Sequence, residues 1–161
     1  MRVLLLTLLV AAALPAAAQS HTGHVEPVGP AAGASPVEAV RAAVVRLFDG
    51  MRAADSSAVR AAFHPAARLM TVRTGGEGPG VVEGNLEGFY TAVADAPVTY
   101  DERVGEIEVR VDGGLATAWM PYRFYAGDRF SHCGVNAMQL VLDAAGWRIV
   151  HAVDTRRTAC E

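Results

Sequence analysis

The chain has 161 residues, of which 52% are hydrophobic, and its 17 acidic and 14 basic side chains give a net charge of −3. This length suits a single domain with one hydrophobic core that needs no metal or disulfide to hold it together. Every basic residue is an arginine, and the small charge imbalance argues against a nucleic-acid surface or a polybasic membrane patch.

The first eighteen residues have the pattern of an export signal. Arg2 precedes an apolar run over residues 3–14, and Pro15 and small residues lead to a cleavage site after Ala18. The apolar run is too short to span a membrane stably. The sequence therefore predicts a signal peptide over residues 1–18 and an exported mature protein, periplasmic or secreted, without an integral membrane segment. In that oxidising compartment Cys133 and Cys160 are expected to form a disulfide.

A flexible leader is predicted over residues 19–34, which are rich in Gly, Pro, Ala and His and show no period. Ordered structure is expected from Ser35 onwards. Ser35 to Glu38 forms a capping box with proline at the first helical position. Apolar residues then recur at helical spacing and predict a long amphipathic helix: Val37, Val40, Val44, Leu47, Phe48 and Met51.

Two shorter helices and a strand follow. Asp55 is placed to cap a second helix that ends before Pro65, and a short strand is predicted over residues 68–73. Residues 75–84 are rich in glycine and predict a mobile loop, and they lack the lysine and spacing of a phosphate-binding loop. The apolar spacing from Leu86 to Val93 predicts the last helix.

After Pro97 the hydrophobic period changes from 3.6 to 2. Turn residues divide this part into four predicted antiparallel strands over 102–111, 115–125, 130–142 and 147–156. Helices followed by a run of antiparallel strands predict an α+β fold in which the sheet covers the helices.

The alternation within strand 130–142 assigns its faces, because the larger apolar groups stand at even positions. A hairpin with Asp143 opposite Gly146 would set Met138 opposite His151. This register predicts four polar side chains on the inner face: His132, Asn136, His151 and Thr155. It predicts that Cys133, Arg148, Asp154 and Arg156 point outward. Buried polar groups need partners, so the inner set implies either a hydrogen-bonded network or a wet cavity.

Two strands are less constrained by the pattern. In strand 115–125, a two-residue turn would point Trp119 and Arg123 inward, whereas a three-residue bulged turn would point Met120 and Tyr122 inward. In strand 102–111, Glu102, Glu106, Glu108 and Arg110 share a parity that is typical of a solvated face.

The order of these elements, together with "GWRIVHAVDTRRTAC" from Gly146 to Cys160, resembles the nuclear transport factor 2-like superfamily, and within it SnoaL-like and "putative lumazine-binding" proteins. The resemblance covers residues 36–160 and implies one domain over 35–161. It implies a cone in which a strongly bent, mainly antiparallel sheet wraps a long first helix and two short helices. It also implies an apolar pocket at the open end and a homodimer formed through the sheet.

The resemblance leaves two functional hypotheses, since the superfamily contains both enzymes and binding proteins. The first is a small-molecule-binding protein whose pocket is lined by His132, Asn136, His151, Tyr90, Trp119 and Tyr122. The alternative reading of these residues is a satisfied structural network.

The second hypothesis is a lyase or isomerase that acts on a small apolar carbonyl or alcohol compound. His132 would be its general base, and Asn136 or a tyrosine would stabilise negative charge on oxygen. The pattern places no inward carboxylate and predicts no cofactor. It also disfavours a metal site at His132 and Cys133, because adjacent strand residues point to opposite faces.

Overall fold

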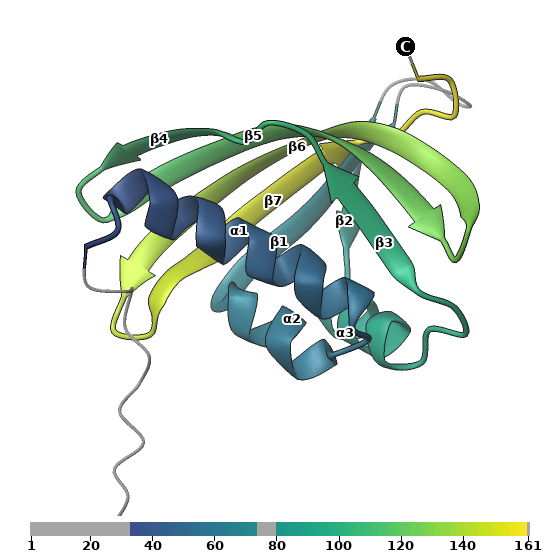
Figure 1. The fold of residues 1–161 in the computed structure, drawn as a ribbon, viewed down its shortest axis with the longest axis horizontal. Coiled ribbons are helices and arrows are strands. Elements are labelled where there is room, and N and C mark those ends of the chain that lie inside the picture. Colours follow the sequence, from purple (N-terminus) through teal and green to yellow (C-terminus); the bar gives the residue numbers. More distant parts are fainter. Residues whose placement is uncertain (1–32, 74–79, 161) are drawn as a thin grey trace, which may run out of the picture.

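The computed structural model describes residues 33–73 and 80–160, so the predicted signal peptide and most of the predicted leader lie outside the described residues. Within this part, one curved sheet arches over three helices (Figure 1). The fold class predicted from sequence, an α+β cone around the first helix, is confirmed. The helices are α1 (Pro36–Arg52), α2 (Ser56–Ala62) and α3 (Leu86–Ala94). The strands are β1 (Phe63–Arg73), β2 (Gly80–Gly84), β3 (Tyr100–Val104), β4 (Glu108–Asp112), β5 (Leu115–Ala126), β6 (Arg129–Asp143) and β7 (Gly146–Thr155).

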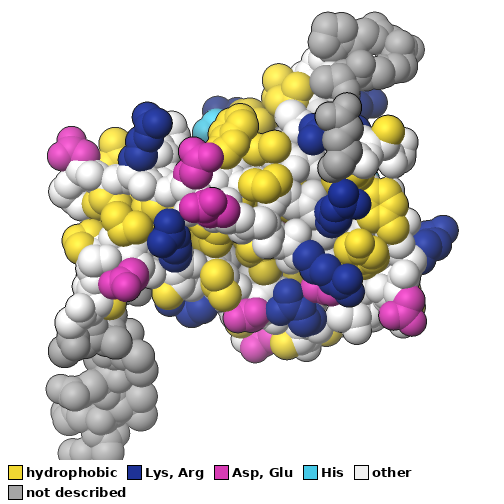
Figure 2. Space-filling model, turned by 45° about the horizontal axis from the view of Figure 1, so that its top comes forward, with side chains coloured by type: hydrophobic (Ala, Val, Ile, Leu, Met, Phe, Trp, Pro, Cys, Tyr) yellow, Lys and Arg dark blue, Asp and Glu magenta, His cyan; other side chains and the backbone are white. Residues whose placement is uncertain are grey.

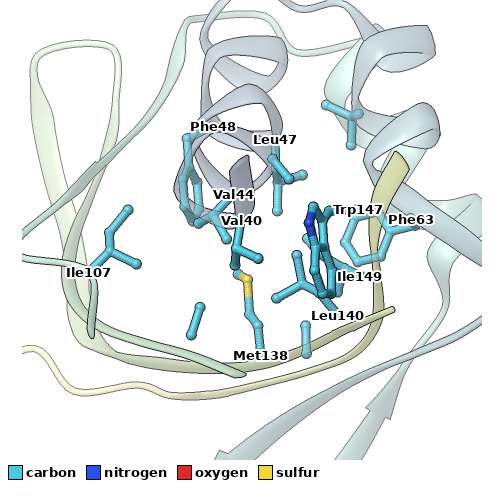
Figure 3. Packing of buried hydrophobic residues seen from close by; sticks show 14 of the residues in the cluster. Val40, Val44, Leu47, Phe48, Phe63, Ile107, Met138, Leu140, Trp147 and Ile149 are labelled. Atoms are coloured by element: carbon cyan, nitrogen blue, oxygen red, sulfur yellow. The ribbon is translucent and has the colours of Figure 1, made fainter. Parts of the chain in front are cut away.

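A polar residue caps the start of each helix, and two of these caps, Ser35 and Asp55, are predicted from the sequence. The Glu38 amide donates to Ser35 Oγ at 3.2 Å, and Glu38 Oε2 accepts from the Ser35 amide at 2.8 Å, so the capping box is complete. Asp55 caps α2 and Asn85 caps α3. The apolar stripe of α1 is buried against the inner face of the sheet (Figure 3).

The strands follow the order β2-β1-β7-β6-β5-β3, and β4 also pairs with β5. The predicted meander is present, but β1 extends it by pairing with β7 in parallel, and it begins five residues before the predicted strand. Residues 80–84, predicted as part of a loop, instead form β2 and pair with β1. The sheet is therefore wider than the alternating pattern alone indicates.

The predicted strand 102–111 is interrupted opposite Pro121. The Gly105 amide donates to the Pro121 carbonyl at 2.8 Å. Because proline has no backbone N–H, Pro121 cannot donate a second hydrogen bond to the neighbouring strand. Val104 pairs with Tyr122 and Glu108 with Trp119, which leaves three residues opposite two. This extra residue reverses the parity between β3 and β4. Glu102 consequently shares the inner face with Phe124, and its assignment to a solvated face is wrong.

A second extra residue, Ser131, sets the faces of β5. Ala126 pairs with Arg129 across a two-residue turn, but beyond Ser131 the register shifts so that Phe124 pairs with His132. Met120 and Tyr122 are therefore buried, while Trp119 is 52% exposed. Of the two alternatives for this strand, the one that points Met120 and Tyr122 inward is confirmed.

A third extra residue, Val150, lies in β7. Asp143 pairs with Gly146 as predicted and Leu140 pairs with Ile149, but the next pair is Gln139 with His151. The register with β1 shifts at the same place. Every side chain after Val150 is thereby turned to the face opposite the predicted one. Ala152 and Asp154 are buried, so the predicted inward positions of His151 and Thr155 and the predicted outward position of Asp154 are wrong.

Gly134 lies where β6 and β7 approach too closely for any side chain. A Cβ at this position would collide with the Thr155 backbone and lie 2.9 Å from the Tyr122 ring. Gly134→Ala is therefore expected to lower the free energy of unfolding by about 2 to 3 kcal/mol, as measured by urea denaturation. Gly114→Ala is the control, because the nearest atoms to its added Cβ, on Leu142, are 3.9 Å away. Equal stabilities of the two variants would contradict this account.

The carboxy-terminal residues first continue the line of β7 beside β6 and then cross to the outer face of the sheet. Cys133 and Arg157 exchange two backbone hydrogen bonds of 2.9 Å. Cys133 and Cys160 form the predicted disulfide, with their Cα atoms 6.3 Å apart. Cys133 points away from the core, as predicted, and is buried beneath these last residues. Within the described part of the chain, no helix is both long and apolar enough to cross a membrane.

Candidate functional site

A cavity of about 90 Å³ lies between α1 and the inner face of the sheet. Most of its wall is apolar: Leu47, Phe48 and Met51 come from α1, Phe63 and Leu69 from β1, Phe89 from α3, and Met138 and Ala152 from the sheet centre. Glu102, Asn136, Asp154 and Arg156 interrupt this apolar wall. This lining, mainly apolar with a few converging polar groups, is typical of a small-molecule site, although the volume is smaller than the roughly 300 to 1,000 Å³ that is usual for one.

Glu102 and Asn136 form the central polar pair of this wall. Asn136 Nδ2 donates to Glu102 Oε1 at 2.7 Å, which brings β3 and β6 together across the intervening strand β5. Asn136 is 7% exposed. Its predicted inward position is therefore confirmed, and its partner is a carboxyl group that the alternating pattern assigned to solvent.

The ionisation of Glu102 is strongly perturbed. The residue as a whole is half-buried, but its carboxyl group is densely surrounded by protein. Burial raises the pKa of Glu102 to about 7, with the Asn136 hydrogen bond and the Arg156 charge opposing the rise and the Asp154 charge adding to it. Near neutral pH the cavity therefore holds a carboxyl group that exists in both protonation states.

Asp154 is the second inward carboxylate, and it is held by three neighbours. Its Oδ1 accepts from Thr71 Oγ1 at 2.6 Å, and its Oδ2 accepts from Tyr122 OH at 2.9 Å and from Arg156 Nε at 2.7 Å. Thr71 lies in β1, Tyr122 lies in β5, and Arg156 directly follows β7. Asp154 thus has the partners that a buried charge requires, which distinguishes it from Glu102.

Tyr122 links this network to the backbone. Its hydroxyl proton is shared between Asp154 Oδ2 and the Thr155 carbonyl, 3.0 Å away. Burial, followed by the Asp154 charge, raises the pKa of Tyr122, so the phenol stays protonated and acts as a donor.

Tyr122→Phe is expected to lower the free energy of unfolding by about 1 to 2 kcal/mol, because both acceptors lose a buried donor. Urea denaturation at pH 7 measures this difference. Tyr125→Phe removes a hydroxyl that has no hydrogen-bond partner among the described residues, and should change the free energy by less than about 0.5 kcal/mol. A Tyr122→Phe protein as stable as the parent would show that the network does not stabilise the fold.

His132, the base expected from sequence, lies on the inner face but does not line the cavity. Its ring packs edge-on against Tyr122 and tilted against Phe124, with centroid separations of 5.7 and 5.1 Å. Its Nδ1 lies 3.0 Å from Ser131 Oγ. Burial lowers the pKa of His132, the Arg156 charge lowers it further, and the Asp154 charge opposes both. The histidine is therefore mainly neutral and packed among aromatic rings.

The other predicted pocket residues are dispersed. Tyr90 is buried in α3 against Phe63 and Phe89, and it contributes to the core rather than to the cavity wall. Trp119 and His151 line a hollow of about 540 Å³ on the outer face of the sheet. Among the residues predicted to line the pocket, the structure thus brings Asn136 to the cavity wall and Tyr122 into the adjoining network.

Two further hollows are larger than this cavity but have different linings. One of about 800 Å³ lies between α1, α2 and the turn before β7, and alanines make up much of its wall. Another of about 280 Å³ lies beside the disulfide on the outer face. Neither contains an inward pair comparable to Glu102 and Asn136. No three His, Cys, Asp or Glu side chains in the described ranges are grouped as a metal site requires.

The family model described as "putative lumazine-binding" matches residues 35–153. The chain belongs to this family. Membership of the nuclear transport factor 2-like superfamily, expected from the order of elements, is thereby confirmed. No curated protein matches this family member.

Solved structures agree with this lumazine-binding family member in fold. A nuclear transport factor 2-like protein of unknown function from Shewanella baltica is 17% identical and covers 76% of this chain and 94% of its own, with a TM-score of 0.57. A "putative dehydratase" of the same superfamily from Streptomyces avermitilis is also 17% identical, covers 76% and 96%, and has a TM-score of 0.61. A Cytophaga hutchinsonii protein is 9% identical, covers 77% and 100%, and has a TM-score of 0.62. At these identities the similarity shows the fold alone.

Proposed function

We propose that the chain binds a small, largely apolar molecule with one hydrogen-bonding group in the cavity between α1 and the sheet. The observation that carries this proposal is the Glu102–Asn136 pair on an otherwise apolar wall. A buried carboxyl group lowers stability unless it is well partnered, and Glu102 has one hydrogen-bond partner and a raised pKa. Such groups concentrate at functional sites. The family description supports ligand binding but does not identify the ligand.

Methionine methyl signals provide a direct test of this site. Met51 and Met138 line the cavity, whereas Met70 and Met120 do not. In the mature protein labelled with ¹³C at its methionine methyls, a small-molecule extract of the source cells should shift the first two signals selectively. Ala152→Leu fills the cavity and should abolish the shift, and Ala137→Leu makes the same change on the outer face and should preserve it. A shift that survives in Ala152→Leu would place the ligand elsewhere, and no shift with the parent protein would contradict the proposal.

A second candidate function is acid–base catalysis by a lyase or isomerase on a carbonyl or alcohol compound. It is favoured by the position of Glu102 in the cavity and by its pKa near neutrality, where a carboxyl group both accepts and donates protons. One protein of the same fold is described as a "putative dehydratase". Under this proposal any turnover is lost in Glu102→Gln and retained in His132→Ala. The reverse result would restore His132 as the base.

We also propose that the protein is exported and that residues 1–18 are removed. Export is supported by the signal-like pattern of residues 1–18 and by the Cys133–Cys160 disulfide, a bond typical of oxidising compartments. Mass spectrometry of the protein isolated from its own cells should find a chain that begins at Gln19. A chain in which residues 1–18 remain attached would contradict this proposal.

We also propose a homodimer formed through the outer face of the sheet. Hydrophobic side chains lie on this side between charged ones (Figure 2), and the hollow around the exposed Trp119 also contains Glu108 and Arg110. A two-fold axis there would set each carboxylate of one protomer near an arginine of its partner. Light scattering should show a dimer that Trp119→Glu dissociates and Val98→Glu, at another exposed apolar site, does not. A monomeric parent protein would contradict this interface.

A further inference from the structure

We infer that the cavity selects uncharged molecules with an apolar body and a carbonyl group, and that Glu102 recognises the carbonyl oxygen as a neutral acid. This inference rests on the proposed binding function and specifies its ligand class. It depends on which atoms of the Glu102–Asn136 pair remain available and on the charges around them.

The pair leaves one carboxyl oxygen available. Asn136 Nδ2 donates to Glu102 Oε1, so the acid proton resides on Oε2. Within the described residues, no enclosed side-chain nitrogen or oxygen lacks a hydrogen-bond partner. Among these residues Oε2 has no partner, and it is therefore accessible rather than sealed in the core. A protonated Oε2 on this wall is a hydrogen-bond donor that requires an acceptor.

The surrounding charges favour the neutral acid. No arginine or histidine nitrogen in the described ranges lies within 4.0 Å of the Glu102 carboxyl, while Arg156 is hydrogen-bonded to Asp154. The flanking Arg52 and Arg103 both pair with Asp101. The helix above presents apolar side chains, namely Leu47, Phe48 and Met51. Asp154 and the phenol of Tyr122 contribute no positive charge.

These surroundings disfavour charged ligands. An anion would meet the Asp154 charge and an apolar wall, and the one arginine of the wall, Arg156, is already paired with Asp154. A cation would lose its hydration against Phe48, Phe63 and Phe89. An uncharged carbonyl group loses less on leaving water and accepts the Glu102 proton in a hydrogen bond. The rest of the molecule packs against the apolar wall.

Three probes of matched shape test the ligand class. Cyclohexanone has the carbonyl acceptor, methylenecyclohexane has the same ring without an acceptor, and cyclohexylamine carries a positive charge. Titrations of the mature protein follow the Met51 and Met138 methyl signals at pH 6 and pH 8. Cyclohexanone is expected to bind more tightly than methylenecyclohexane at pH 6. Its dissociation constant should then rise about tenfold by pH 8, because the neutral fraction of an acid with a pKa of about 7 falls by that factor.

Two variants separate the effect of the hydrogen-bond donor at position 102 from the effect of Glu102 ionisation. Glu102→Gln keeps an N–H donor of similar shape, so the preference for cyclohexanone should persist while its pH dependence disappears. Glu102→Leu removes the donor, and the two uncharged probes should then bind equally. Near-native amide spectra of both variants provide the control for folding.

Each contrary result has a separate meaning. Equal binding of cyclohexanone and methylenecyclohexane at pH 6 would overturn the inference while leaving the proposed binding function intact. Cyclohexylamine that binds more tightly than both, and more strongly at pH 8 than at pH 6, would overturn it in favour of cations. If none of the three probes shifts Met51 or Met138, the inference and the proposed cavity function both fail.

Discussion

Glu102→Gln is expected to make the protein more stable than its parent at pH 8, by about 3 kcal/mol, because the pKa of Glu102 is raised from 4.5 to about 7 by folding. Between these two values the unfolded chain has lost the Glu102 proton while the folded protein retains it. The folded state therefore binds more protons, and the stability of the parent falls as the pH rises through this window. Below pH 4 both states are protonated and the difference disappears.

Urea denaturation of the parent and variant at pH 4, 6 and 8 measures this effect. The difference in free energy of unfolding should grow steadily from near zero at pH 4. Glu106→Gln is the control, because it makes the same change at an exposed position four residues away, and its difference from the parent should stay small at every pH. A Glu102→Gln difference that does not change with pH would show that the cavity carboxyl group is solvated.

Reduction of the Cys133–Cys160 disulfide is expected to lower the free energy of unfolding by about 3.5 kcal/mol, the chain-entropy value for residues that lie 27 apart in the sequence. The crosslink constrains the unfolded chain across the hairpin of β6 and β7. In the folded protein it also holds Arg157 against Cys133, and Arg156 lies beside it as a partner of Asp154. Amide exchange at residues 154–157 should therefore accelerate when the bond is broken.

Denaturation with and without a thiol reductant measures the effect of the disulfide. The reductant should have no effect on a Cys160→Ser variant, which is the control for other actions of the thiol. Equal stability of the oxidised and reduced proteins would mean that the last residues are held by their backbone hydrogen bonds alone.

The sequence allowed the helices and the order of most strands to be predicted, because each has a local signal. The disulfide was predicted from the expected oxidising compartment and the presence of two cysteines. Ser35 and Glu38 mark the start of α1, and the change of period after Pro97 marks the meander. The parallel pairing of β1 with β7 has no comparable local signal, since its paired residues, such as Thr71 and Asp154, are 83 positions apart in the sequence. The width of the sheet was underestimated for the same reason.

The site was predicted only in part, because the face of each strand depends on counting residues in pairs. One additional residue at 105–107, at Ser131 and at Val150 reverses the assignment beyond each point. No additional residue lies between Asn136 and the apolar half of β6 from which the faces were assigned, so Asn136 was placed correctly. Glu102 and Asp154 were placed on the wrong face. The extra residue at 105–107 could have been anticipated from Pro121 in β5, because a proline inside a sheet indicates irregular pairing with the neighbouring strand. No comparable sign accompanies Val150.

Val150 has a consequence for how this fold tolerates change in sequence length. Deleting it would restore unbroken alternation along β7 and exchange the two faces of its second half. The inner side would then carry His151, Val153 and Thr155 in place of Ala152 and Asp154, although no residue of the strand had been substituted. Insertions and deletions of a single residue in these strands are thus a short route by which one scaffold acquires a different pocket, and sequence comparisons within the fold must allow for them before residues are assigned as equivalent.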